Sequence, residues 1–242
     1  MEAATNNEAL TTPVVRHAEG LLLVDKPAGV TSHDMVLAAR RAYGERSIGH
    51  LGTLDPFATG LLVMLLGRST RLATFIITEP KVYEATIRFG AETDTDDSTG
   101  AVIRNAPLPE TAAVHSAIAS LTGDLMQVPP SYSAKSIDGE RAYDSARRGE
   151  PLALAAVPVR VHGWDVHEIA PDFIRATISC GSGTYIRALA RDLGRASGSA
   201  AHLESLRRTR CGDFNVRDAA SLKDLRDKPP PLRSLTVVAG NV

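Results

Sequence analysis

The residues best suited to chemistry lie in one stretch, from Ile48 to Gly67. Its first half is a loop rich in glycine around a single acid, Asp55. Its second half, Leu61 to Leu66, is an unbroken apolar run that predicts a strand buried on both faces. A carboxylate in such a loop is held by a rigid scaffold and can still reach a ligand. The same residues fit equally a tight turn that Asp55-Pro56 starts, so the chemistry depends on partners elsewhere in the chain.

The composition indicates a globular protein without a metal site. The 242 residues are 43% apolar and 23% charged, with a net charge of −1, which suits one large domain or a domain with a small appendage. The two cysteines, Cys180 and Cys211, belong to no Cys-x-x-Cys pattern or His/Cys cluster, so we expect neither a disulfide framework nor a metal. The sequence has neither a signal-peptide pattern nor an apolar run of membrane-spanning length, so we expect a soluble cytoplasmic protein.

The elements that position Asp55 follow from hydrophobic periodicity. A short strand begins at Gly20, and a helix is expected from about Ser32 to Tyr43, capped by Thr31 or Ser32 and ended by Gly44. Residues 81–89 alternate between polar and apolar, which predicts a half-buried antiparallel strand with Tyr83 on its apolar side.

The rest of the chain mixes helices and strands irregularly, which predicts an α+β domain rather than a doubly wound nucleotide fold. The acidic residues 90–100 lack the terminal glutamate of an EF-hand and are expected to form a solvated loop. Other predicted elements are helices at 69–77 (capped by Ser69 or Thr70), 109–121, 142–148 and 185–196 (capped by Thr184), and strands at 157–169 and 173–180.

Positive charge is concentrated on both sides of the glycine-rich motifs. Residues 38–72 have a surplus of three arginines over acids, and residues 187–217 a surplus of four. A nearly neutral protein can therefore present a basic groove that binds phosphates in a salt-dependent way. The alternative is that these arginines are simply solvated on helix surfaces.

A series of motifs in chain order resembles the bacterial tRNA pseudouridine-55 synthases, the TruB-like family. The resemblance covers about residues 20 to 214, and the pattern Gly-His-x-Gly-x-Leu-Asp-Pro within it is highly specific. The matching segments are Lys26-Pro-Ala-Gly-Val-Thr-Ser32, residues 49–60, Lys81-Val-Tyr83, Thr93-Asp-Thr-Asp96, Gln127-Val-Pro-Pro130 with Tyr132-Ser-Ala134, Gly139 and Ala142-Tyr143, Ser182-Gly-Thr-Tyr-Ile-Arg187, and Leu206-Arg-Arg208.

This resemblance implies a fold and a reaction. The fold would be that of the pseudouridine synthases: a central mixed, mainly antiparallel sheet flanked by helices, with a small RNA-gripping insertion at about residues 124–150. The reaction isomerises the T-loop uridine at tRNA position 55, breaking its N-glycosidic bond and rejoining the base through carbon. Nothing is consumed, so the resemblance implies no cofactor and no metal.

The resemblance also assigns roles to single residues. Asp55 would be the catalytic aspartate, and Arg187 would pair with it through charge-assisted hydrogen bonds. Tyr83 would stack on the flipped base and assist proton transfer, Leu206 would wall the pocket, and His50 would fill the space that the base leaves. Further residues expected to bind the RNA are Lys26, Gly52, Thr53, Leu54, Tyr185, Arg207 and Arg208.

Each of these residues has an ordinary structural alternative on the sequence alone. Tyr83 and Leu206 fit core positions, Arg187 fits a helix surface, and His50 fits a histidine with its hydrogen bonds satisfied inside the glycine loop. The roles therefore depend on the family match.

The sequence departs from the family pattern in two places. Lys135 directly follows Ala134, one position earlier than is usual, which in an extended segment turns the side chain to the other side. Many members also carry a C-terminal PUA-like RNA-binding domain, whereas fewer than thirty residues follow Phe214 here. We therefore expect a flexible segment at 1–17, a catalytic domain at 18–214 and a short tail at 215–242.

The expected partner is tRNA, bound through its T arm and T loop by a monomeric protein. The nearest rival is a guide-RNA-dependent synthase of the dyskerin-like branch, which normally relies on a PUA domain. A rival of another class is an RNA chaperone that opens the tRNA elbow.

Overall fold

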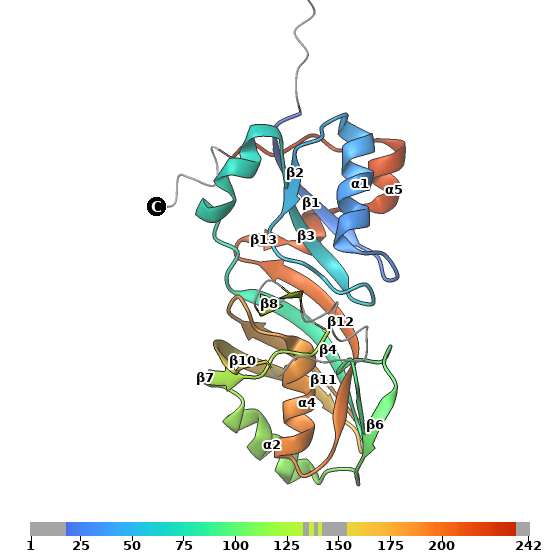
Figure 1. Cartoon of the computed structure of the whole chain (residues 1–242), viewed down its shortest axis with the longest axis vertical. Helices are drawn as coiled ribbons and strands as arrows, with labels where there is room; N and C mark the ends of the chain where they lie inside the picture. The colour runs from blue at the N-terminus through green and yellow to red at the C-terminus, as the bar shows by residue number, and fades with distance from the viewer. Residues whose placement is uncertain (1–17, 133–135, 138–139, 142–153, 236–242) are drawn as a thin grey trace, which may run out of the picture.

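The computed structural model describes residues 18–132, 136–137, 140–141 and 154–235 (Figure 1). The predicted flexible segment at 1–17, the helix at 142–148 and the shifted Lys135 lie outside these residues. In the described part, no helix is both long enough and apolar enough to cross a membrane.

A ten-stranded mixed sheet runs through the molecule, and most of its strand pairs are antiparallel, as predicted. Its order is β14-β1-β3-β12-β4-β11-β10-β7, with β2 added to β3 and β13 to β12. The strands are β1 (Gly20–Lys26), β2 (Ile48–His50), β3 (Thr59–Leu66), β4 (Lys81–Phe89), β7 (Gly123–Gln127), β10 (Val157–Ile169), β11 (Phe173–Cys180), β12 (Ala201–Cys211), β13 (Phe214–Asn215) and β14 (Ala220–Ser221).

Helices cover the sheet in two groups (Figure 1). α1 (Ser32–Tyr43) and α5 (Leu222–Asp227) lie side by side on the half that contains β1 and β3, and α2 (Thr111–Ser120) and α4 (Ile186–Ala196) cover the half that contains β4. Smaller elements are the 3-10 helices η1 (Gly67–Phe75) and η2 (Val216–Asp218), the pair β5 (Ala91–Thr93) and β6 (Val102–Asn105), and the pair β8 (Ser136–Ile137) and β9 (Glu140–Arg141).

The two halves of the sheet meet at one short parallel contact. β3 and β12 pair only at Thr59 with Arg207 and at Gly60 with Arg208. We call β14, β1, β3 and β2 the first half-sheet, and β12, β4, β11, β10 and β7 the second half-sheet. The loop that carries Asp55 enters β3 directly before this junction.

The predicted elements nearest Asp55 are confirmed. Thr31 caps α1 in a reciprocal capping box with Asp34, and Gly44 ends the helix with a left-handed φ of 64°. β3 is buried on both faces: Leu62, Met64 and Leu66 pack toward α1, and the alternate residues pack into a separate core cluster. β4 alternates as expected, with Tyr83 on its buried side.

Several predicted element ends are wrong. The helix after β3 is a 3-10 helix that begins at Gly67 without a side-chain cap, rather than one capped by Ser69 or Thr70. The cap position of α4 is Tyr185, so Thr184 does not cap that helix. Both errors arise because a hydroxyl near a helix start is a weak signal, whereas tertiary contacts fix the first turn.

Residues 216–235 are folded onto the first half-sheet. β14 pairs in parallel with β1, and Leu21 and Arg233 exchange backbone hydrogen bonds of 2.9 and 2.8 Å. The Tyr43 hydroxyl of α1 donates to the Pro230 carbonyl at 2.6 Å. This segment covers the edge of β1, which would otherwise expose unpaired backbone groups.

The junction between the half-sheets generates a stability prediction. A methyl group at Gly60 would lie 2.8 Å from the Arg208 backbone nitrogen and would overlap its carbonyl, at a φ of 103°. We expect Gly60→Ala to lower the free energy of unfolding by about 3 kcal/mol or more, because overpacking and backbone strain add. Urea unfolding followed by circular dichroism measures this.

The matched control is Gly163→Ala in β10, where no atom lies within 4 Å of the added methyl. That change should stay within about 1 kcal/mol of wild type. Equal losses in the two variants would contradict a steric constraint at the junction.

Candidate active site

Asp55 lies in a turn that two neighbouring segments hold in place. The Ala58 amide donates to the Asp55 carbonyl at 3.1 Å, so Asp55-Pro56 does start a turn. The Ser32 hydroxyl, at the start of α1, bonds the Leu54 amide at 2.9 Å and the Leu54 carbonyl at 3.1 Å. The Gly29 amide donates to the Pro56 carbonyl at 2.9 Å. The turn is therefore fixed from both sides of Asp55.

The Asp55 carboxylate is held by Arg187 in a bidentate ion pair. Arg187 Nε lies 2.9 Å from Oδ2, and Nη2 lies 3.2 Å from Oδ1. The arginine side chain is 5% exposed, whereas the aspartate side chain is 34% exposed. The pair thus has a buried donor that fixes orientation and a carboxylate that a ligand can still reach.

Arg187 is itself held by further acceptors. Its Nη1 donates to the Thr95 carbonyl and its Nη2 to the Tyr132 carbonyl, both at 2.8 Å. A second carboxylate, from Asp97, lies 3.6 Å from Nη1. Because these partners fix the guanidinium, its geometry does not depend on Asp55 alone.

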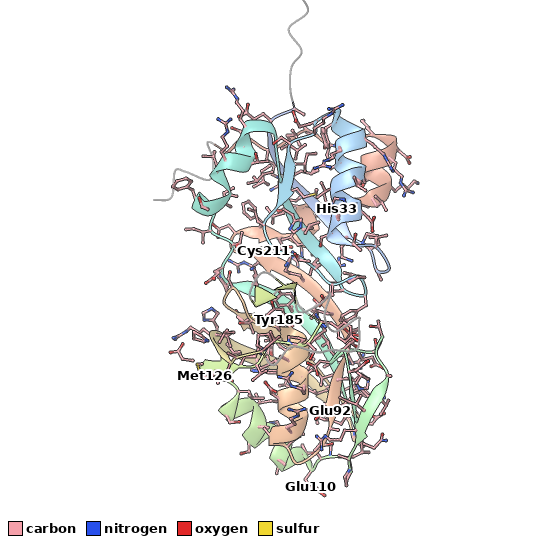
Figure 2. All side chains as sticks on the ribbon, viewed as in Figure 1. His33, Glu92, Glu110, Met126, Tyr185 and Cys211 are labelled. Carbon is pink, nitrogen blue, oxygen red and sulfur yellow. The ribbon has the colours of Figure 1, made fainter. Side chains whose placement is uncertain are left out.

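The same face of α4 carries two further ion pairs, each with a buried carboxylate. Arg191 Nη1 binds Asp96 Oδ2 at 2.8 Å, and Arg195 binds both carboxylate oxygens of Glu92 at 3.0 and 2.8 Å. In Figure 2, Tyr185 lies at the start of α4 and Glu92 beside the far end of that helix. Burial raises the pKa of Asp96 to about 6.

The predicted solvated loop at 90–100 is therefore wrong. Glu92, Asp96 and Asp97 are all buried and paired with arginines on α4. The signal that sequence reasoning missed is the spacing of Arg187, Arg191 and Arg195, which repeats every four residues and places them on one helix face.

Tyr83 and Leu206 form apolar walls beside Asp55. Both are buried and belong to one core cluster with Leu54, against which Phe57 of the Asp55 loop packs. Burial raises the pKa of the Tyr83 hydroxyl to about 12, so the phenol stays protonated at neutral pH. Leu206 also lines an open groove, whereas Tyr83, which is 7% exposed, is not among the residues that line it.

This groove has a volume of about 1090 Å³. Pro56, Phe57 and Leu206 contribute to it, and so do the polar side chains of Glu84 and Arg175 from the second half-sheet. Asp55 is not among its lining residues, so the groove adjoins the carboxylate rather than containing it.

His50 ends β2 with its ring largely buried. In the described part of the chain, its Nδ1 has no hydrogen-bond partner. Burial, and secondarily the charges of Arg208 and His33, lower the pKa of His50, so the ring is neutral at neutral pH. A neutral ring with an unsatisfied nitrogen is compatible with a side chain that moves when RNA binds.

Lys26 and Arg208, two residues expected to bind RNA, have buried side chains in this structure. Lys26 is fully buried, and its ammonium donates to the carbonyls of Pro27, Val30 and Pro56 at 3.0, 2.8 and 3.2 Å. Burial lowers its pKa to about 8, although Asp55 opposes this shift. Lys26 therefore fastens the turn before α1 to the Asp55 loop.

The other residues expected to bind RNA lie in varied surroundings. Arg207 forms a bidentate pair with Asp25 at 2.7 and 3.0 Å. Thr53 is exposed, and the Gly52 carbonyl accepts from Arg208. The backbone of Tyr185 pairs with the side-chain amide of Gln127 at 2.9 and 3.2 Å, a partner that sequence reasoning missed.

Metal ligands are not gathered anywhere in the described ranges: no group of three or more His, Cys, Asp or Glu side chains lies close enough to hold an ion.

The comparisons with known proteins place the chain among the pseudouridine synthases. The sequence model of the "TruB family pseudouridylate synthase (N terminal domain)" matches residues 40–186, and that of the "tRNA pseudouridylate synthase B C-terminal domain" matches residues 187–230. The chain belongs to the TruB family and is an isomerase.

Curated relatives agree with this assignment. The tRNA pseudouridine synthase B of Arthrobacter sp. (strain FB24) is 48% identical over 217 residues, which are 86% of this chain and 71% of that protein. The protein of the same name from Mycobacteroides abscessus is 48% identical over 225 residues, covering 90% of this chain and 75% of the relative.

Solved structures share the fold at lower identity. A chain of the "Crystal Structure of a Cbf5-Nop10-Gar1 Complex" superposes with a TM-score of 0.66 and 27% identity over 86% of this chain. A chain of the "Structure of H/ACA RNP bound to a substrate RNA containing 2'-deoxyuridine" superposes with a TM-score of 0.63 and 25% identity over 86% of this chain. The present chain spans 54% and 52% of those two chains, about half of each.

The ion pairs of α4 predict a specific pH dependence. Burial alone would raise the pKa of Glu92, but hydrogen bonds from Arg195 and Arg104 lower it from 4.5 to about 2. A carboxyl group whose pKa is lowered in the folded state stabilises the fold at pH values above the ordinary carboxyl pKa of 4.5. This contribution to the free energy of unfolding is lost as the pH falls toward 2. We expect Glu92→Gln to cost roughly 3 kcal/mol at pH 7 and progressively less between pH 5 and pH 3, as urea unfolding would show.

The matched control is Glu168→Gln, which removes an ion pair with Arg175 in which both side chains are substantially exposed. It should change the free energy of unfolding by less than about 1 kcal/mol. A Glu92→Gln deficit that stays constant from pH 7 to pH 3 would contradict the assignment.

Proposed function

We propose that this protein converts the T-loop uridine of tRNA, at position 55, to pseudouridine, with Asp55 as the catalytic aspartate. The observation that carries the proposal is the bidentate pair of Asp55 with a buried Arg187, which leaves the carboxylate accessible beside an apolar pocket.

The reaction suits such a carboxylate. Breaking a glycosidic bond and rejoining the base through carbon requires a nucleophile or base that is oriented and partly shielded from water. Arg187 orients the carboxylate, and its other acceptors keep the guanidinium in place when Asp55 reacts. No step requires an external reactant.

The pocket suits a base that has left its stack. Extruding the uridine costs a few kcal/mol in unstacking, which contacts with Tyr83 and Leu206 would offset. His50, at the end of β2, would then occupy the vacated space, and its buried Nδ1 would gain partners in the RNA. Thr53 and the exposed arginines of the basic runs would contact the T arm.

The substrate assignment rests on the relatives. Identity to proteins named tRNA pseudouridine synthase B is 48%, against 25% and 27% to the H/ACA and Cbf5 chains. This difference favours direct recognition of tRNA over guidance by a second RNA. We further propose that the protein acts as a monomer in the cytoplasm.

Asp55→Asn should abolish pseudouridine formation on an unmodified tRNA transcript, because the amide cannot act as nucleophile or base. RNA binding should remain within about threefold of wild type, because the substitution preserves shape and removes a negative charge. Mapping of pseudouridine by chemical labelling and primer extension, together with filter binding, measures both quantities.

The control for this variant is Asp213→Asn, a similar change at a side chain that is 92% exposed. Modification that survives in Asp55→Asn would contradict the catalytic assignment. A wild-type protein that needs a guide RNA would move the function to the dyskerin-like branch, and RNA refolding without modification would favour a chaperone.

Tyr83→Phe tests the hydroxyl separately from the ring. Because the phenol stays protonated, we expect it to assist proton transfer, and its loss should slow single-turnover modification by about 10²-fold or more. The ring still stacks, so the dissociation constant for tRNA should barely change. An unaltered rate would confine Tyr83 to stacking.

A further inference from the structure

Arg208 is a buried cation at the junction of the two half-sheets. Its side chain is only 1% exposed and is among the largest fully buried side chains of the described residues. Its guanidinium donates to three backbone carbonyls: Nε to Leu61 at 2.8 Å, Nη2 to Gly52 at 3.0 Å and Nη1 to Thr53 at 3.4 Å. Leu61 belongs to β3, and the other two lie in the loop just before Asp55.

The Arg208 guanidinium also acts on Tyr83. Arg208 and Tyr83 are directly opposite each other on β12 and β4, and the charge of the guanidinium acts on the Tyr83 hydroxyl, lowering its pKa against the effect of burial. Its charge also acts on the ring of His50. Arg208 thus contacts the Asp55 loop through its hydrogen bonds and lies opposite Tyr83 in the sheet.

The neighbouring arginine has a different environment. Successive residues of a strand point to opposite faces, and Arg207 pairs with Asp25 on the other face of the sheet. The Leu-Arg-Arg motif therefore supplies one arginine to each face, and Arg208 is the one that reaches the Asp55 loop.

Burying this cation is costly for the fold. Among the residues that the structure describes, Arg208 forms no ion pair with a carboxylate, and backbone carbonyls accept its hydrogen bonds. An apolar side chain of similar length would avoid this desolvation cost. The geometry that the arginine imposes is a physical reason for its presence.

We propose that Arg208 is a positioning residue that fixes the Asp55 loop relative to the Tyr83 ring and so sets the width of the base pocket. It acts through the loop and the tyrosine and does not contact RNA phosphates. The inference rests on the proposed function, because the pocket it shapes is the proposed uridine pocket.

Arg208→Lys is the central test, since lysine keeps the charge but cannot donate in a fork to three carbonyls. We expect single-turnover modification at saturating enzyme to slow by about 10²-fold, because small misplacements of reacting groups have effects of this size. The dissociation constant for tRNA and its dependence on salt concentration should match wild type. The matched control is Arg210→Lys on the same strand, whose Nε donates only to the Gly212 carbonyl.

Salt dependence separates positioning from RNA contact. Losing a phosphate contact would lower the slope of log binding constant against log salt by about one. A lowered slope in Arg208→Lys, or a rate within twofold of wild type, overturns the proposal. A combined Arg208→Lys and Tyr83→Phe variant should show less than the product of the two rate losses, whereas a multiplicative loss argues against action through Tyr83.

Hydrogen exchange provides a readout that does not depend on activity. Arg208→Lys should speed amide exchange in residues 50–58 by at least tenfold and leave α2 unchanged, while Arg210→Lys should alter neither. If Arg208→Lys leaves amide exchange in residues 50–58 unchanged, the inference is wrong, whatever the rate of modification. If wild-type protein fails to modify tRNA but the exchange result holds, the proposed function fails and the positioning role remains. Should Arg208→Lys not fold, Arg208→Met, which keeps an unbranched side chain without the charge, replaces it in both assays.

Discussion

The close approach of β3 and β12 is the constraint on which the rest of the structure depends. Two residue pairs join the half-sheets, and at one of them the Arg208 backbone leaves no room for a side chain at position 60. The candidate site spans this junction: Asp55 comes from the loop that enters β3, Tyr83 and Leu206 come from the second half-sheet, and Arg187 comes from α4, which covers that half-sheet. Small changes in the junction would therefore be transmitted directly to the spacing between the carboxylate and the pocket walls.

Buried cations hold the Asp55 loop in place at this junction. Arg187 reaches the Asp55 loop from α4 and Arg208 reaches it from β12, whereas Lys26 reaches the same loop from the first half-sheet. Backbone carbonyls supply most of their acceptors, so the loop is fixed through its main chain and the Asp55 carboxylate needs only one partner. Burying these cations costs desolvation free energy, but it fixes the position of the loop. Such a cost is common where reacting groups must be placed to within a fraction of an ångström.

The sequence predicts elements well where local rules decide them. α1, β3 and β4 follow from capping residues and periodicity, and the proximity of Arg187 to Asp55 followed from the family resemblance. The burial of Glu92 and Asp96 could not be predicted from composition, because an acidic run looks solvated until its partners on α4, about 100 residues later, are known. The burial of Lys26 and Arg208 could not be predicted for a similar reason. A basic residue in a motif of an RNA-binding family suggests a contact with an RNA phosphate, and only the tertiary structure shows that backbone carbonyls accept its hydrogen bonds.

The return of the chain to β1 has a consequence for how the protein is made. Tyr43 bonds a carbonyl 187 positions later, and β1 is covered by β14. During synthesis the first half-sheet therefore emerges from the ribosome long before the strand and helix that cover its edge and its α1 face. Contacts of such long sequence separation form late and slowly. The Asp55 loop likewise gains its contacts with Arg187 and Arg208 from residues that lie 132 and 156 positions further along the chain, so its final geometry forms late.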